Sequence, residues 1–241
     1  SVKAHGFIYT DKPIFNHGEY RIEDRQWFNS ETNVLLRYRY LPNLFLGPNF
    51  ERRSGDRTVQ EERVTSHNFR AEFERRVNRE VTATLVGRYG LRFYNDAFAE
   101  RDTQFYSVGP RVTYQAVPWI GFGLAYLYER GLADGRNEPQ FQDDVSYYLH
   151  FLSFDTELRL MPKLSLSLLY VYVRKIFTSG ITGDTHQGRQ DDTHQGRVEL
   201  RYEVAGNAAA TLGYQRTQRS SNQALRDFHD NIFSIGGEYR F

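Results

Sequence analysis

The sequence has no cysteine, no long apolar run and no excess of charge of one sign. Without cysteine, the chain has no thiolate cluster for a metal ion. No stretch approaches the roughly 20 consecutive apolar residues of a membrane-spanning helix, and mean hydropathy is −0.65. Lys+Arg 31 against Asp+Glu 30 leave a net charge of +1, which argues against nucleic acid as a partner. No secretory leader is visible at Ser1, so we expect an exported protein in its mature form.

Aromatic residues are abundant, with 17 Tyr and 18 Phe among 241 residues. Together with other apolar residues they recur at every second position, and the clearest case is the stretch 81–94. Its odd-numbered residues are apolar, aromatic or small, whereas Thr82, Thr84, Arg88 and Arg92 occupy even positions. Because side chains alternate between the two faces of a strand, this period predicts a strand with one apolar and one polar face.

The end of the chain, residues 231–241, shows the same alternation and stops on an aromatic residue. One predicted face carries Asn231, Phe233, Ile235, Gly237, Tyr239 and Phe241. This pattern resembles the closing strand of bacterial outer-membrane β-barrels, which ends in Phe with aromatic residues at alternate positions before it. The resemblance implies a Gram-negative outer-membrane location. It also implies that the assembly machinery of that membrane recognises the strand ending at Phe241.

Twelve segments show the alternation well enough to be predicted as strands. They are residues 2–9, 20–41, 44–53, 63–77, 81–94, 103–115, 119–130, 144–160, 164–177, 196–204, 208–218 and 231–241. Tight turns are predicted at 41–43, 78–79, 116–118, 161–163 and 205–207, and they alternate with longer polar connections. Short turns on one rim and long loops on the other are typical of outer-membrane barrels. We therefore predict an all-β fold: a single domain, 1–241, forming a transmembrane up-and-down antiparallel β-barrel of about 12 strands.

The apolar face of each strand can meet either lipid or a packed core. The alternative to a membrane barrel is thus a soluble antiparallel barrel whose aromatic residues point inward. Numerous charges cannot lie unpaired in a dry core, so in the membrane barrel the ionic face lines a lumen that is water-filled or cross-linked by ion pairs. Arg88, Arg92 and Arg111 lack an acidic partner on their own strands, which predicts a basic wall. The predicted lumen-lining and solute-binding residues are Arg37, Arg39, Arg70, Arg88, Arg92, Arg111 and Arg201.

These patterns favour an outer-membrane channel for passive diffusion of small, anionic solutes. The alternative is a non-conducting structural barrel, plugged by its own Arg–Glu network, that serves as an anchor or a subunit of an envelope complex. We expect an integral protein of the cell outer membrane with its long loops outside the cell. Membrane lipid, small solutes and the assembly machinery are the expected partners, and a homo-oligomer or an envelope complex is the further partner that the alternative implies.

Enzymatic residues and cofactors are not predicted. The chain has no GxSxG element, and alternation places His67 and His150 on the lipid-facing side, away from any catalytic partner. A six-residue sequence, Asp-Thr-His-Gln-Gly-Arg, occurs at 184–189 and again at 192–197. His186 and His194 suggest a metal site, but no HExxH motif or carboxylate cage accompanies them in the sequence. We therefore interpret the repeat as a duplication in an exposed loop and predict no metal.

Overall fold

The computed structural model describes most of the backbone and a smaller set of side chains. Described backbone comprises residues 2–10, 16–29, 32–49, 60–136, 140, 143–206, 208–224 and 226–239. Side chains are described for 34–42, 63–136, 140, 143–206, 208–224 and 226–237. Phe241, the residue predicted to be recognised during assembly, lies outside these ranges.

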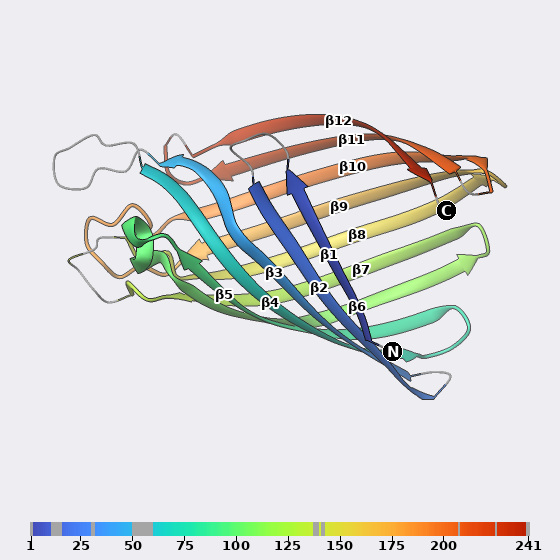
Figure 1. The fold of residues 1–241 in the computed structure, drawn as a ribbon, viewed down its shortest axis with the longest axis horizontal. Helices are drawn as coiled ribbons and strands as arrows, with labels where there is room; N and C mark the ends of the chain where they lie inside the picture. The colour runs from blue at the N-terminus through green and yellow to red at the C-terminus, as the bar shows by residue number, and fades with distance from the viewer. Residues whose placement is uncertain are drawn as a thin grey trace.

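The described residues form twelve strands and one short 3-10 helix, which Figure 1 shows as a single curved sheet. The strands are β1 (Val2–Thr10), β2 (Asn16–Asn29), β3 (Thr32–Asn49), β4 (Gln60–Arg76), β5 (Val81–Tyr94), β6 (Thr103–Val117), β7 (Ile120–Ala133), β8 (Tyr147–Met161), β9 (Leu164–Phe177), β10 (Gln190–Ala205), β11 (Ala208–Ser221) and β12 (Phe228–Tyr239), with η1 (Asp96–Arg101) between β5 and β6. No helix among the described residues is long and apolar enough to cross a membrane.

Each strand pairs antiparallel with its neighbour in the sequence, so the sheet order runs from β1 to β12 without a crossover. The connections 77–80, 118–119 and 162–163 are short and lie on one rim, here called the short-turn rim. The connections 95–102 and 178–189 are long and lie on the opposite, long-loop rim, as do the described residues 134–136 and 143–146 of the connection 134–146 (Figure 1). The predicted antiparallel up-and-down all-β fold is confirmed. Among the described residues no ladder joins β1 to β12, and closure into a barrel stays a prediction.

The apolar face of the sheet is exposed. Leu85 is 54%, Tyr106 48% and Leu124 53% exposed, and no large described side chain is fully buried. In β6, exposed residues alternate with buried ones from Thr103 to Pro110, so one face points outward and the other inward. A soluble barrel would have packed these aromatic residues inside. The exposed aromatic face is therefore the outer face, and the face with the arginines, here called the ionic face, is the inner one.

One predicted turn is wrong. The stretch 20–41, predicted as one strand, is divided between β2 and β3, whose pairing begins at Asn29 and Thr32. The predicted turn at 41–43 lies inside β3, where the register against β4 shifts between Leu41 and Leu44. Pro42 falls at this shift, and since proline has no N–H for a ladder hydrogen bond, a bulge accommodates it. The pairing of Asn29 with Thr32 would by itself invert the alternation, but the register shift between Trp27 and Asn29 restores it. Even-numbered residues therefore share one face in both strands, which is why the sequence pattern did not reveal the hairpin.

Candidate functional site

Three arginines of the ionic face lie side by side across three strands. Arg37 of β3 is the register partner of Arg70 in β4, and Arg70 is in turn the partner of Arg88 in β5. The row continues through Ser107 in β6 to Glu129 in β7. Like charges at directly paired positions destabilise a sheet by up to about 1 kcal/mol per pair. Such a row therefore needs an anion close by.

The carboxylate of Glu72 supplies part of the negative charge that the row of arginines needs. Glu72 of β4 forms an ion pair with Arg70 and lies 3.3 Å from Nη1 of Arg37. Nε of Arg88, like Nε of Arg37 and Oγ of Ser107 in the same row, is buried and has no hydrogen-bond partner among the described residues. A buried guanidinium nitrogen without an acceptor is costly. Within the described part of the row, an added anion would thus find unused donor atoms at and beside Arg88.

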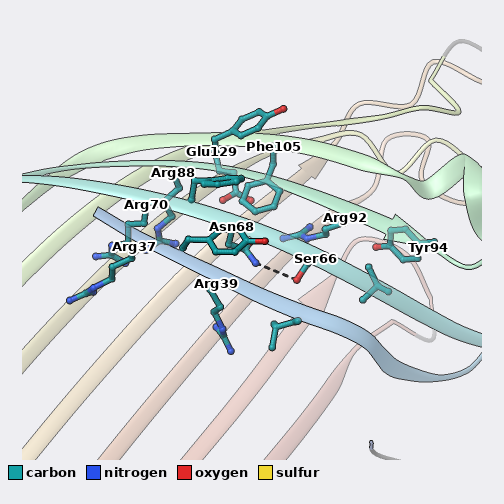
Figure 2. Close-up of a pocket in the computed structure, with 15 residues that line it drawn as sticks. Arg37, Arg39, Ser66, Asn68, Arg70, Arg88, Arg92, Tyr94, Phe105 and Glu129 are labelled. Carbon is teal, nitrogen blue, oxygen red and sulfur yellow. Dashed lines mark hydrogen bonds between the residues drawn. The ribbon is translucent and has the colours of Figure 1, made fainter. Parts of the chain in front are cut away.

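The row borders a cavity of about 770 Å³ on the ionic face. Figure 2 shows the guanidinium groups from β3, β4 and β5 around this space, with Phe105 and Glu129 beside Arg88. Five of the seven predicted arginines line it, and Glu129 is the one carboxylate among its lining residues. Its charged and ring-bearing lining consists of Arg37, Arg39, Arg70, Arg88, Arg92, Glu129, Tyr38, Phe69, Tyr89, Tyr94 and Phe105.

Arg92 is held in place by two aromatic residues that sequence analysis did not identify. Its guanidinium carbon lies 4.4 Å from the centre of the Phe105 ring, and its Nη1 donates to the Tyr147 hydroxyl at 3.3 Å. Phe105 is the register partner of Gly90. A Cβ at Gly90 would lie 2.2 Å from the Phe105 ring, so glycine is what allows the ring to occupy this space. The alternation in the sequence indicates the aromatic residues of the outer face. It does not indicate that an inward-facing aromatic residue such as Phe105 lies opposite a glycine.

Tyr147 links the arginine cavity to a second cation. Its hydroxyl donates to Oε1 of Glu129 at 2.7 Å, and Nζ of Lys175 lies 4.0 Å from the centre of its ring. The side chain is almost fully buried, at 2% exposure. Cations over aromatic rings are favourable contacts, and more so where water is excluded. Arg92, Lys175 and Glu129 are thereby joined through one buried tyrosine.

The two remaining predicted arginines lie outside this cavity. Nη2 of Arg111 is 3.2 Å from Oδ1 of Asp155 in β8, so the acidic partner that its own strand lacks comes from a different strand. The pair reaches across β7, where a Cβ at Gly123 would lie 2.4 Å from the Asp155 carboxylate. The missing side chain at Gly123 is what allows this contact between strands that are not neighbours. Arg201 lies in β10, opposite Ser165 and Thr211.

The histidines on the strands follow the predicted facing. Nδ1 of His67 lies 2.8 Å from the Tyr38 hydroxyl, and the same distance joins His150 to Tyr126. Tyr126 is 39% exposed, and Tyr38 is the register partner of Phe69, which is 47% exposed, so both tyrosines belong to the outer face. The prediction that His67 and His150 lie on the outer face is therefore confirmed. Each is diagonally paired with a tyrosine of the adjacent strand, which stabilises the sheet surface.

Comparisons with known proteins identify the fold. No protein-family model and no curated protein matches the chain. The NanC porin matches with a TM-score of 0.54 at 10% identity, over 100% of this chain and 99% of that chain. A loop-deletion mutant of OmpT, an outer-membrane protein of Vibrio cholerae, matches with a TM-score of 0.56 at 10% identity, over 99% and 96%. The Pseudomonas putida toluene transporter TodX matches with a TM-score of 0.55 at 10% identity, over 100% of this chain and 77% of that chain.

The chain has the fold of a bacterial outer-membrane β-barrel.

The outer-membrane barrel fold explains why the exposed face is apolar. In that fold the outer surface meets hydrocarbon, so leucine and phenylalanine on it are in their favourable environment. It also explains why arginines on the ionic face can remain charged, because a lumen can contain water.

Proposed function

We propose that this protein is an outer-membrane channel for passive diffusion of small anionic solutes. The observation that carries the proposal is the cavity lined by Arg37, Arg39, Arg70, Arg88 and Arg92, with Glu129 as the one carboxylate in its lining. Five arginines against Glu129 and against Glu72, which pairs with Arg70 and Arg37, leave the site with an excess of positive charge. A focused field of one sign concentrates ions of the opposite sign in a narrow passage.

Arginine favours solutes with a carboxylate, sulfate or phosphate group. The planar guanidinium can donate two parallel hydrogen bonds to such a group. Two unit charges at about 4 Å attract by about 1 kcal/mol in water and about 4 kcal/mol near a protein surface. Several arginines, each with an attraction energy in this range, would attract an anion without trapping it, provided that water remains in the lumen. Passage by diffusion needs this intermediate strength.

The proposed location follows from the fold. We place the protein in the outer membrane as an integral barrel, with the short-turn rim towards the periplasm and the connections 95–102, 134–146 and 178–189 outside the cell. This orientation is typical of outer-membrane barrels, in which periplasmic turns are short and external loops are long. Recognition of Phe241 by the assembly machinery remains part of the same proposal.

The anionic solute proposed for this chain differs in kind from the solute of TodX, which is a toluene transporter. An aromatic hydrocarbon has no group that can accept hydrogen bonds from guanidinium. Moving it past Arg70, Arg88 and Arg92 would displace water from these charges without replacing the lost hydrogen bonds. The charged lining therefore supports an anionic cargo for this chain.

Single-channel recording in planar lipid bilayers tests the proposal. Under a KCl gradient we expect discrete conductance steps and a zero-current potential that indicates preference for Cl⁻ over K⁺. Arg88→Gln should lower the Cl⁻/K⁺ permeability ratio by about fivefold, because removing a charge at about 4 Å in water costs about 1 kcal/mol. Arg216→Gln is the matched control, since Arg216 lies exposed on the outer face of β11 and the ratio should not change.

Two outcomes would contradict the channel. If pure, folded protein gave no conductance steps, the lumen would be closed and the non-conducting structural barrel would be the better description. Recovery of a stoichiometric partner from detergent extracts would then support an envelope complex. If the protein conducted but preferred K⁺, or if Arg88→Gln and Arg216→Gln had equal effects, the arginine cavity would not determine the selectivity.

A further inference from the structure

A second cluster of ionisable side chains lies at the long-loop rim, apart from the arginine cavity. Asp143 belongs to the connection 134–146, and Asp184 and His186 belong to the connection 178–189. All three are buried, and one donor atom of each lies within 4.8 Å of the other two. The two connections follow different hairpins, so only the folded sheet brings these residues together.

Asp184 is oriented by backbone groups of both connections. Its Oδ1 accepts a hydrogen bond from the backbone N–H of His186 at 2.8 Å, and its Oδ2 accepts one from the N–H of Asp144, also at 2.8 Å. The Asp184 side chain is 0% exposed. The turn is completed by Gly183 and Gly188, whose φ angles of 88° and 68° favour glycine. The position of the Asp184 carboxylate is therefore set by the backbone.

Asp143 is oriented by an arginine. Nε of Arg101, at the end of η1, donates to Oδ2 of Asp143 at 2.6 Å. The other oxygen, Oδ1, is buried and has no well-oriented hydrogen-bond partner among the described residues. Burial opposes the charge of Asp143, but the contact with His186 and the charge of Arg101 outweigh it and lower the pKa of the carboxyl. Asp143 is therefore an ionised side chain that is more than nine-tenths buried, and its Oδ1 has no well-oriented hydrogen bond.

His186 lies between the two carboxylates. Its Nδ1 is 3.3 Å from Oδ1 of Asp143 and 3.2 Å from Oδ1 of Asp184. A single N–H can point at only one of these oxygens, and the other tautomer would direct three lone pairs at one another. A cation between the three atoms satisfies all of them at once. A tetrahedral metal ion with bonds of about 2.0–2.1 Å has ligand atoms about 3.3–3.4 Å apart, which matches both separations.

We propose that this cluster binds one first-row divalent transition-metal ion, with Zn²⁺ as the representative. The ligands are Nδ1 of His186, Oδ1 of Asp143 and Oδ1 of Asp184, and water completes the tetrahedron. One imidazole with two carboxylates is a donor set suited to Zn²⁺ and its neighbours. Arg101 is a positioning residue that fixes Asp143 through its outer oxygen. A bound ion would join the connection after β7 to the connection after β9.

The sequence repeat supplies an internal comparison. In the second copy, Asp192 accepts a hydrogen bond from the Tyr172 hydroxyl at 2.6 Å, and Nδ1 of His194 lies 2.8 Å from the Tyr170 hydroxyl. Both residues are in β10, so this copy is a strand and the interpretation of the whole repeat as an exposed loop is wrong. No third acidic or imidazole donor joins Asp192 and His194 among the residues searched. The same six residues thus have a cluster of ligands only at 184–189.

Titration of the folded protein with Zn²⁺ tests the site. We would use protein without a histidine tag, folded in detergent and freed of metal with a chelator, and measure binding by calorimetry. We expect one Zn²⁺ per chain and a Co²⁺ derivative with the intense visible absorption of tetrahedral coordination. His186→Ala should weaken Zn²⁺ binding by at least about 100-fold and Asp143→Asn by at least about 10-fold, since even groups that only orient a ligand change affinity by about 10–100-fold.

His194→Ala is the matched control, because it removes the same side chain from the second copy. Its Zn²⁺ affinity should equal that of the unaltered chain. A heat-dependent shift in gel mobility would confirm that each variant is folded. Zn²⁺ should also slow proteolysis of the connection 178–189 in the unaltered chain but not in His186→Ala, a difference that a purely structural histidine would not produce. Absence of Zn²⁺ binding, or equal binding by His186→Ala and His194→Ala, would overturn the proposal.

Discussion

Replacing Arg101 by methionine removes the cation from a buried ion pair while keeping much of the side-chain volume. Nε of Arg101 and Oδ2 of Asp143 are 2.6 Å apart, and the two side chains are only 7% and 8% exposed. The guanidinium also stacks 4.9 Å from the centre of the Phe98 ring. In Arg101→Met the Asp143 carboxylate stays buried without the guanidinium and keeps only its contact with His186. Removing one partner of a buried pair typically costs about 3–5 kcal/mol.

This cost should appear as local opening of the long-loop rim, because the strands are held by their own ladders. The N–H of Gly135 donates to the Glu100 carbonyl oxygen at 2.8 Å, and the N–H of Asp144 donates to Asp184 at 2.8 Å, so both report on the closed rim. A loss of about 3–5 kcal/mol corresponds to roughly 100- to 5000-fold faster hydrogen exchange at these amides. Exchange should be measured by mass spectrometry with chelator present, which keeps any metal ion from contributing.

Two variants make this prediction specific. Arg101→Met combined with Asp143→Leu removes both charges, and it should exchange within about 10-fold of the unaltered chain, since apolar replacement of a whole pair is often neutral. Arg197→Met removes a cation from the pair with Glu199, whose side chains are 47% and 30% exposed, and rim exchange should not change. If the double variant opened as readily as Arg101→Met alone, the cost would come from packing, and the reasoning from an uncompensated buried charge would be refuted.

The contacts of Asp143 with His186 and with Arg101 also determine how the rim responds to acid. Because the pKa of Asp143 is lowered in the folded chain, its carboxylate stabilises the closed rim above the ordinary value of about 3.9. This stabilisation is lost as pH falls through the lower folded value. Rim exchange, corrected for the intrinsic rate at each pH, should therefore stay constant from pH 7 to about 4 and rise below it. In Arg101→Met the rise should begin at higher pH.

Two further predictions concern the sheet. Leu85→Arg places a charge on the outer face in the middle of β5, and it should lower the free energy of unfolding in lipid vesicles by about 2–4 kcal/mol, whereas Leu85→Phe should change it little. Gly90→Val must displace the Phe105 ring, because even a Cβ would lie 2.2 Å from it. Overpacking of this kind costs about 1–3 kcal/mol in denaturant titrations, and release of Arg92 from the ring should alter the conductance. An unchanged stability in either variant would contradict the assigned facing of β5.

Most of the strand architecture can be predicted from the chain alone, because alternation is a local property. The predicted stretches 81–94 and 164–177 coincide with β5 and β9, and the outer position of Leu85 follows from counting by two. Counting by two gave the wrong result at the hairpin of β2 and β3, which was predicted as one strand. A connection that keeps the alternation in phase leaves no trace in the pattern, and Pro42 suggested a turn at a position where the folded strand has a bulge.

The face of the sheet on which each side chain lies was therefore determined by the sequence itself. Every second side chain of a strand points to the same face, whatever surrounds the strand. The partners of the charges were decided only by the tertiary structure. Arg111 meets Asp155 because Gly123 leaves a gap in the strand between them, and His186 meets Asp143 because two separate loops fold onto one rim. Identical sequence at 184–189 and 192–197 has two different environments for the same reason. Contacts between distant segments depend on which strands become neighbours, and that information is spread over the whole chain.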